Sequence, residues 1–284
     1  MRNVGSYVSH SFVVIHIHCS SLTLVIEFEY KRELNHKCNR QGEIMKIEIK
    51  SVSKRFGNKQ ILKDINLVAN SGEILCILGP SGAGKTTLIR LITGSIMADS
   101  GEIIIDGKKQ PNMNSIKDIG FMPQSEAIYD DISGLDNLLF FGRLFGLRGK
   151  SLRERADRTL DMVNLKEDKN KLAANYSGGM KKRLSLAITL IHEPSILILD
   201  EPTVGIDPVL RKSIWNEFED LRKLGRTIIV STHVMDEAER CQKAALIYGG
   251  ILIESDEVEK LKGKTHSGSL EELFFTAEKA GAQI

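Results

Sequence analysis

From residue 45 onward, apolar residues recur in short runs separated by turn residues, and this pattern predicts an alternation of strands and helices. The segment from about Asn137 to Leu172 is charged and helical in period. A second long helix is predicted from near Ser177 to about Ile191. The predicted strands are Lys46–Val52, Ile61–Val68, Glu73–Leu78, Gly101–Ile105, Ile119–Met122, Ser195–Leu199, Thr227–Val230, Ala244–Tyr248 and Ile251–Glu254.

Two of these strands, Ser195–Leu199 and Thr227–Val230, are continuous apolar runs rather than alternating ones. Each is reached through a helical segment, and this combination is typical of parallel strands buried on both faces of a sheet. A glycine pair, Gly249 and Gly250, signals a short hairpin later in the chain. The pattern therefore predicts an α/β fold with a buried parallel sheet.

The first 44 residues do not follow this pattern, because two apolar patches, Phe12–Ile15 and Leu22–Ile26, have histidine and cysteine between them. A secretory signal is one interpretation, but His16 and His18 interrupt its apolar core. The favoured interpretation is a dispensable extension, or upstream sequence before the native start, because a strand suited to open a domain begins at Met45. A metal site is also conceivable, although no pair of its candidate ligands has zinc-finger spacing. The candidate ligands are His16, His18, Cys19, His36 and Cys38.

Composition narrows the class of protein. The apolar content of 42% and the charged content of 27% are ordinary for a globular chain. A net charge of +2 gives no basic footprint for nucleic acid or anionic lipid. No run reaches about 18 apolar residues, so no membrane-spanning helix is predicted. The cysteines lack a framework spacing, which fits a reducing compartment, and Cys76 is predicted to be a buried thiol.

A glycine-rich loop with the pattern G-x-x-x-x-G-K-T separates the strand Glu73–Leu78 from a helix. Glycines let backbone N–H groups turn inward around a β-phosphate, and the helix points its positive dipole end at the same anion. Lys85 would bridge the β- and γ-phosphates, and Thr86 would give its hydroxyl to Mg²⁺. A plain glycine-rich turn is the alternative. The candidate phosphate-binding residues are Gly79, Pro80, Ser81, Gly82, Ala83, Gly84, Lys85, Thr86 and Thr87.

Two carboxylates, Asp200 and Glu201, directly follow the apolar strand Ser195–Leu199. The carboxyl end of a buried strand is where α/β proteins bind ligands. Because ionised carboxylates are costly to bury without a cation, the pair indicates a metal site in which Asp200 would orient Mg²⁺. Glu201 would take a proton from an attacking water. The alternative is a strand that ends in solvent with two exposed acids.

A second pattern suited to an anion is the segment Asn175–Arg183, with the sequence Asn-Tyr-Ser-Gly-Gly-Met-Lys-Lys-Arg. Ser177 can cap the helix that begins at Gly178, and the glycines Gly178 and Gly179 leave backbone N–H groups open to a close anion. The segment resembles the signature of the ATP-binding subunits of ATP-binding-cassette (ABC) transporters. This resemblance covers essentially all of residues 45–282.

The resemblance implies roles for four further residues. Gln124 would touch Mg²⁺ and the attacking water and sense the membrane partner, and Asp207 would contact the opposite subunit. His233, just after the strand Thr227–Val230, would donate a hydrogen bond to the γ-phosphate. Phe56 would stack on adenine. The alternatives are a solvated glutamine, a structural histidine and a core phenylalanine.

Two residues depart from the family signature, since Tyr176 and Met180 stand where leucine and glutamine are usual. The Ser-Gly-Gly core is intact, so the departure affects only a contact from the glutamine side chain. A signature of this form resembles the exporter branch that handles drugs, antibiotics, polysaccharides or lipids. The segments Asp136–Leu138, Phe140–Leu147 and Ser269–Phe275 resemble the same branch.

The resemblance implies a P-loop NTPase core with a mostly parallel sheet, an antiparallel β subdomain and a helical subdomain. The implied domains are an atypical extension over residues 1–44, an ABC ATPase domain over 45–255, and a short C-terminal helical tail over 256–284. The helical subdomain would span about 125–178, and its residues around Asp130–Leu147 would receive a helix of the membrane partner.

The implied activity is hydrolysis of ATP with Mg²⁺, at sites shared with a second copy or a paralogous ATPase subunit. In that resemblance, Ser177 and Gly179 serve the nucleotide held by the other copy. Hydrolysis would power export through a separate membrane-spanning permease, at the cytoplasmic face of the cell membrane. An ABC importer subunit shares every catalytic motif and is the alternative. A further alternative is a non-transport cassette protein that acts in DNA repair or translation. The chain has a single uninterrupted cassette and no basic stripe, which argues against a nucleic-acid partner.

Overall fold

The structure, a computed structural model, divides the chain into two compact units, Met1–Glu43 and Ile44–Ile284. In the first unit, β1 (Phe12–Cys19) and β2 (Leu22–Glu29) form an antiparallel hairpin. Both apolar patches of the N-terminal segment belong to these strands. The structure describes residues 12–19, 22–29 and 46–281. Outside these ranges lie several residues named from the sequence, namely His36, Cys38, Met45 and Ala282.

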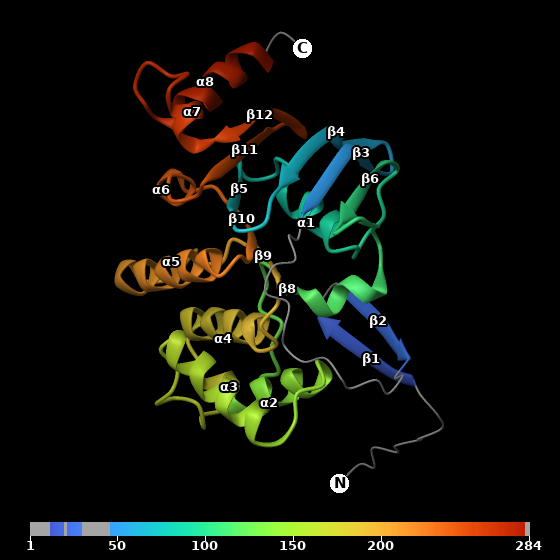
Figure 1. The fold of residues 1–284 in the computed structure, drawn as a ribbon, viewed down its shortest axis with the longest axis vertical. Helices are drawn as coiled ribbons and strands as arrows, with labels where there is room; N and C mark the ends of the chain where they lie inside the picture. Colours follow the sequence, from blue (N-terminus) through green and yellow to red (C-terminus); the bar gives the residue numbers. More distant parts are fainter. Residues whose placement is uncertain (1–11, 20–21, 30–45, 282–284) are drawn as a thin grey trace. The chain divides into compact units, whose positions relative to one another are not determined.

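The central sheet of the second unit has six strands: β5 (Ile74–Leu78), β8 (Ile119–Met122), β9 (Ile196–Asp200), β10 (Thr227–Thr232), β11 (Lys243–Tyr248) and β12 (Ile251–Glu257). Their order is β12-β11-β5-β10-β9-β8, and all neighbours are parallel except β11 and β12 (Figure 1). Every residue of β5, β9 and β10 is buried, as expected of strands covered on both faces. The predicted parallel sheet and the hairpin at Gly249 and Gly250 are confirmed.

A second sheet is antiparallel and has the strand order β4-β3-β6-β7. Its strands are β3 (Ile47–Phe56), β4 (Lys59–Ala69), β6 (Ser100–Ile105) and β7 (Lys108–Lys109). The tight turn between β3 and β4 contains Gly57, whose φ of 56° favours glycine. The strands predicted in this region are confirmed, and β3 runs four residues beyond its predicted end at Val52.

The central sheet separates two hydrophobic cores, because successive side chains of a strand point to opposite faces. In β5, Ile74, Cys76 and Leu78 face one core, whereas Leu75 and Ile77 face the other. The first core is shared with the helices that follow β8 and β9, and the second with the antiparallel sheet and the helix after the phosphate loop. Cys76 is a buried free thiol, as predicted.

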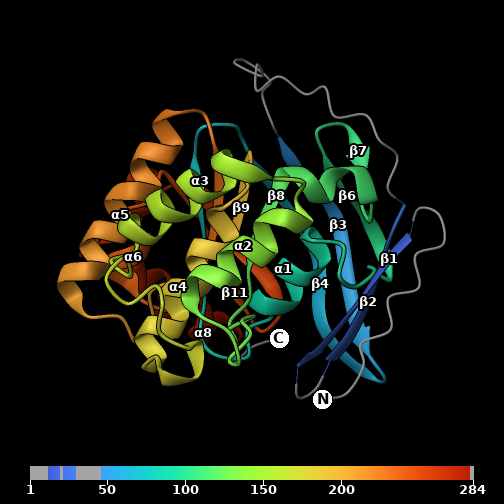
Figure 2. The same ribbon diagram turned by 90° about the horizontal axis from the view of Figure 1, so that it is seen from below.

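Eight α-helices and two short 3₁₀ helices belong to the described residues: α1 (Lys85–Ile92), η1 (Met113–Asp118), α2 (Gly134–Leu144), α3 (Gly149–Met162), η2 (Ala173–Asn175), α4 (Gly178–Leu190), α5 (Pro208–Lys223), α6 (Met235–Ala238), α7 (Val258–Lys262) and α8 (Leu270–Gly281). The helices α2, α3 and α4 pack against one another below the edge of the central sheet (Figures 1 and 2). None of the helices in the described ranges is long and apolar enough to span a bilayer.

Tyr176 explains one of the two departures from the family signature. Its side chain is buried, and its hydroxyl donates to the backbone oxygen of Asp168 at 2.8 Å. The ring lies against Gly134, where an added Cβ would be 2.3 Å from the tyrosine oxygen. Tyr176 therefore joins the start of α2 to the loop before α4. A leucine at this position could not make the hydrogen bond to Asp168.

Candidate active site

The phosphate loop joins β5 to α1, and glycine shapes both of its ends. A Cβ at Gly79 would lie 2.3 Å from the backbone oxygen of Ile247, so a larger residue would displace the backbone. Gly84 has a φ of 105° and directly precedes the first residue of α1. The structure thus places residues 79–87 at the N-terminus of a helix, where the first-turn N–H groups have no intrahelical partner and suit an anion.

Lys85 is almost fully buried beneath this loop, and its ammonium donates to the backbone oxygens of Gly79 (2.7 Å) and Pro80 (3.0 Å). Burial lowers the pKa of Lys85 from its usual value, while the nearby carboxylates of Glu201 and Asp200 oppose that shift. Because an ammonium has three donors, Lys85 can hold the loop and still donate to a phosphate oxygen.

Asp200, the last residue of β9, is 1% exposed, and its two carboxylate oxygens have different surroundings. Ser231 donates its hydroxyl to Oδ1, whereas Oδ2 is buried without a hydrogen-bond partner in the described part of the chain. Such an oxygen is costly unless a cation or a donor satisfies it. Thr86, Gln124 and Asp200 line one hollow of about 220 Å³. These oxygen-bearing side chains therefore fit Mg²⁺, which prefers oxygen ligands and keeps several waters.

Glu201 lies between Gln124 and His233. Its Oε2 accepts a hydrogen bond from Gln124 Nε2 at 3.2 Å, and its Oε1 is 3.0 Å from Nδ1 of His233. The backbone of Glu201 has a φ of 52°, an uncommon conformation for a residue other than glycine and one that occurs at functional sites. The three side chains come from the loops after β8, β9 and β10, so the structure brings together residues 109 positions apart at one edge of the sheet.

The signature residues are not part of this group. Ser177 caps α4 by accepting a hydrogen bond from the backbone N–H of Met180 at 3.3 Å, as the sequence predicted. Ser177 and Gly178 are exposed, so the N-terminus of α4 is open to solvent. No hydrogen bond between described residues joins this helix end to the phosphate loop. The two hollows lined by phosphate-loop residues likewise include none of Ser177, Gly178 and Gly179, so within one chain the two predicted anion sites do not share a hollow.

The turn that contains Asp207 lies beside the signature. Asp207 caps α5, and its Oδ1 accepts from the backbone N–H of Leu210 at 3.0 Å. The backbone oxygen of Gly205 is 3.6 Å from the position that a Cβ on Gly179 would take. Asp207 is itself exposed. Two segments for which the resemblance implies contacts with a second copy thus lie on one exposed region.

Phe56 ends β3 and is 50% exposed, so the alternative of a core phenylalanine is wrong. The ammonium of Lys54 lies 5.5 Å from the centroid of its ring. An exposed aromatic face next to a cation suits the stacking of a base whose phosphates carry negative charge.

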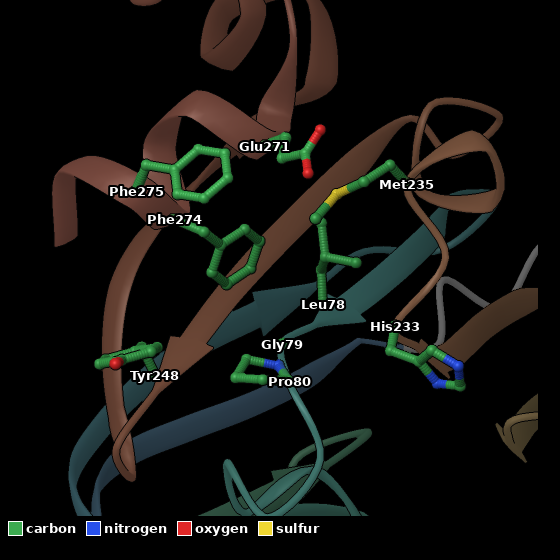
Figure 3. Close-up of a pocket in the computed structure, with 9 residues that line it drawn as sticks. All are labelled: Leu78, Gly79, Pro80, His233, Met235, Tyr248, Glu271, Phe274 and Phe275. Carbon is green, nitrogen blue, oxygen red and sulfur yellow. The ribbon is translucent and has the colours of Figure 1, made fainter. Parts of the chain in front are cut away.

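A cavity of about 270 Å³ lies between the phosphate loop and the C-terminal helix α8. Figure 3 shows Pro80 and His233 on one side of it, with Phe274 and Phe275 on the other. Phe275 is more than half exposed. The sequence marks the segment that includes these phenylalanines only as a subfamily feature, and its position beside the loop and His233 comes from the structure.

Two further side chains at the site had no signal in the sequence. Ser231 binds the carboxylate of Asp200, and Glu237 accepts hydrogen bonds from the side chains of two threonines near Glu201 and His233. A serine at the end of a strand and an acid on a short helix are common in any protein. Only their hydrogen bonds to residues distant in the sequence identify them.

Comparison with known proteins identifies relatives of this chain. The ABC transporter family model matches residues 62–204. The probable multidrug ABC transporter ATP-binding protein YbhF of Escherichia coli is 36% identical over 221 residues, which are 77% of this chain and 38% of that protein. The Nod factor export ATP-binding protein I of Sinorhizobium fredii is 38% identical over 219 residues, or 76% of this chain and 64% of the relative. The chain thus spans less than two thirds of the length of either relative.

Solved structures have the same fold. A dimeric ATP-binding cassette in a post-hydrolysis state, bound to ADP and phosphate, superimposes with a TM-score of 0.70 at 26% identity. The match covers 74% of this chain and 98% of that one. The antiparallel sheet, the parallel sheet and the helical group described above therefore form the architecture of a known nucleotide-binding fold.

Proposed function

Because the chain belongs to the ABC transporter family, we propose that it is the ATP-hydrolysing subunit of an exporter and that it drives a separate membrane-spanning permease. The observation that carries this proposal is the position of Glu201. Its carboxylate is held between Gln124 and His233, next to the buried Asp200 and within the electrostatic reach of Lys85. A base (Glu201), a group that can orient water (Gln124) and two groups that can bind phosphate (Lys85 and His233) thus converge at the carboxyl ends of neighbouring strands.

Each side chain has a task in hydrolysis that its geometry supports. The backbone N–H groups of residue 79 and residues 81–87, together with the Lys85 ammonium, bind the phosphates. Gln124 orients the water, and Glu201 accepts a proton from it as the water oxygen attacks the γ-phosphorus and ADP leaves. Nδ1 of His233 is engaged with Glu201, so Nε2 is the nitrogen that would donate to a γ-phosphate oxygen.

Thr86, Gln124 and Asp200 would hold Mg²⁺, which when bound neutralises charge on the β- and γ-phosphates. Their position around one hollow supports this assignment, as does the Oδ2 of Asp200, which has no hydrogen-bond partner among the described residues. Phe56 would stack on the adenine, since its exposed ring stands at the end of β3.

We further propose that two chains close around two ATP molecules. Ser177, Gly178 and Gly179 stand at an exposed helix end that is separate from the phosphate loop of the same chain. A helix N-terminus suits a γ-phosphate, and the signature of one copy would serve the nucleotide bound by the other. Asp207 would contact that second copy, and a paralogous ATPase subunit could take its place. A solved dimer of a related cassette supports this arrangement.

The permease is proposed to dock on the helical group, at the cytoplasmic face of the cell membrane. Tyr129, Leu144 and Phe145 are more than a third exposed in this region, and Tyr129 packs edge-on against Phe140 with ring centroids 5.0 Å apart. Exposed aromatic and aliphatic side chains of this kind mark interaction surfaces. The names of the relatives, which include Nod factor export and multidrug proteins, support export rather than import.

The proposed hydrolysis is tested with Glu201→Gln, which keeps the shape of the side chain and removes the base. We expect phosphate release to fall by about 10² to 10⁴-fold, because that is the usual contribution of a general base. ATP binding, followed with a fluorescent ATP analogue, should be retained. Glu102→Gln, which removes an exposed carboxylate of β6 paired with Lys109, is the matched control and should leave both unchanged. A Glu201→Gln chain with the wild-type rate would contradict the assignment.

The proposed docking site is tested by placing a photo-crosslinking residue at position 144 and irradiating native membranes. We expect a crosslink to an integral membrane protein that only detergent extracts. The control position is 102, on the antiparallel sheet, where no such crosslink should form. Equal crosslinking from both positions, or crosslinks only to proteins outside the membrane, would contradict this docking surface.

A further inference from the structure

Glu237 is a buried acid near the catalytic residues, and both of its carboxylate oxygens are engaged. Its side chain is 2% exposed on the short helix α6. Thr203 donates its hydroxyl to Oε1 at 2.5 Å, and Thr232 donates its hydroxyl to Oε2 at 2.7 Å. Both threonines are fully buried. The two hydrogen bonds link segments that lie about thirty residues apart in sequence, across the carboxyl ends of β9 and β10.

Each threonine stands next to a residue of the catalytic group. Thr203 is two residues after Glu201, and Thr232 directly precedes His233. The hydroxyl of Thr232 also accepts from the backbone N–H of Val234 at 3.0 Å, so one oxygen atom fixes the backbone on both sides of His233. The Glu237 carboxylate therefore ties the loop of the histidine to the segment that follows the proposed base.

The charge of Glu237 is balanced by Arg211 of α5, whose Nε is 3.9 Å from Oε1. That Nε is buried and has no hydrogen-bond partner in the described part of the chain, so its contact with the carboxylate is electrostatic. Arg211 also donates from a terminal nitrogen to the backbone oxygen of Ile206 at 3.3 Å. Ile206 belongs to the turn that ends at Asp207. The same carboxylate is thus connected to the turn proposed to contact the second copy.

A buried carboxylate is an expensive way to fill space, because desolvating its charge usually costs more than the ion pair returns. Apolar side chains would pack the ends of two strands more favourably. The arrangement at Glu237 instead gives two hydroxyls one fixed acceptor each, and so defines where the two loops lie relative to each other. A fixed separation matters here because Glu201 Oε1 and His233 Nδ1 are within hydrogen-bond distance.

We propose that Glu237 is a positioning residue for ATP hydrolysis, and this rests on the proposed function. Its carboxylate keeps the His233 loop, the Glu201 strand end and the turn before Asp207 in the one arrangement that hydrolysis needs. Because its side chain is buried, it would act through these segments rather than by contact with ATP or the attacking water. Its loss therefore affects the rate of the chemical step more than the binding of nucleotide.

The test uses three variants that remove this connection at different points: Glu237→Gln, Thr203→Val and Thr232→Val. An amide at position 237 has one acceptor oxygen, so one threonine loses its acceptor. Each valine removes one donor, and Thr232→Val also removes the acceptor of the Val234 N–H. We expect kcat to fall by roughly tenfold or more in each, with KM for ATP within about twofold. Because both threonines act through one carboxylate, the Thr203→Val/Thr232→Val double variant should lose less than the product of the two single losses. The rate is divided by the nucleotide bound per chain, so that unfolded protein does not lower kcat.

Two comparisons separate positioning from mere folding. Thr203→Ser and Thr232→Ser keep the hydroxyl and should recover most of the rate lost in the valine variants. Glu239→Gln removes an exposed carboxylate two residues away, paired with Lys262 at 3.4 Å, and should behave as wild type. If kcat per bound nucleotide is unchanged in the valine variants and in Glu237→Gln, or if serine does not recover the rate, the positioning role is wrong. A wild-type chain without ATPase activity would instead overturn the proposed function itself.

Discussion

His192 is predicted to make the stability of the fold depend on pH. Its ring stacks on Phe145 with centroids 3.7 Å apart and planes 3° from parallel. Nε2 lies 3.2 Å from the backbone oxygen of Ile119, which assigns the proton of the neutral ring to Nε2. Nδ1 is buried without a hydrogen-bond partner in the described residues. Protonation would place a charge and a new donor at that unpartnered atom, and burial accordingly lowers the pKa of His192 to about 4.

The magnitude follows from this shift. The unfolded chain binds the proton near its ordinary pKa of 6.5, whereas the folded chain does so only near 4. Above pH 6.5 neither state is protonated, so the full stability is present. As the pH falls from 6.5 to 4, only the unfolded state gains the proton and stability is lost. At about 1.4 kcal/mol per pH unit, the free energy of unfolding should decrease by about 3 kcal/mol over this range.

The assay is urea denaturation at several pH values between 7.5 and 4, for the wild type and for His192→Phe and His192→Gln. His192→Phe keeps an aromatic ring against Phe145, and neither replacement can titrate. Other groups contribute equally to all three chains, so the difference between wild type and variants isolates the histidine. We expect the wild type to lose about 3 kcal/mol more than either variant between pH 7 and 4. Parallel stability profiles for the three chains would show that protonation of His192 does not destabilise the fold.

Three further predictions concern other parts of the chain. Tyr176→Phe removes the hydrogen bond to Asp168 and should lower the free energy of unfolding by about 1 kcal/mol without changing ATP binding; an unchanged urea midpoint would show that this bond contributes nothing. Gly79→Ala places a Cβ 2.3 Å from a backbone oxygen and should weaken the binding of a fluorescent ATP analogue by roughly tenfold or more, so wild-type affinity would contradict the role of the loop. A chain that begins at Met45 should retain its circular dichroism spectrum and its ATPase activity, and loss of the fold would show that the N-terminal extension is required.

Much of the fold is predictable because its signals are local. The apolar run before Gly79 and the run before Asp200 each carry a strand and its ligand-binding end within a few residues, so pattern alone located both. The cap at Ser177 is equally local, since a serine before two glycines and a helical period is sufficient. These elements appear in the structure within one or two residues of their predicted bounds.

The convergence of side chains is less predictable, because it depends on strand order. Gln124 and His233 are both within reach of Glu201 only because β8 and β10 flank β9 in the sheet. Hydrophobic periodicity does not reveal the order of the strands in a sheet. Only the family resemblance indicated that these residues act at one site. Glu237 was missed for the same reason, since its partners Thr203 and Thr232 come from other strand ends.

The N-terminal segment shows another limit of pattern. Its apolar patches indicate an extension without defining its secondary structure, and the structure pairs them as β1 and β2 with Phe12 opposite Glu29. A short apolar run such as Phe12–Ile15 does not by its pattern alone distinguish a strand from other structures. Phe56 is a related case, because a phenylalanine at the end of a strand has no pattern that separates a core residue from an exposed stacking surface.

The measurement that most directly tests the shared ATP site is the mass in solution of the Glu201→Gln chain with saturating Mg·ATP. Light scattering during gel filtration should give twice the mass of a single chain with ATP and the mass of one chain without it. Two nucleotides should elute with each pair of chains. A chain that binds ATP fully and still elutes as a single copy would contradict the account, because the exposed signature at Ser177–Gly179 would then have no phosphate to bind.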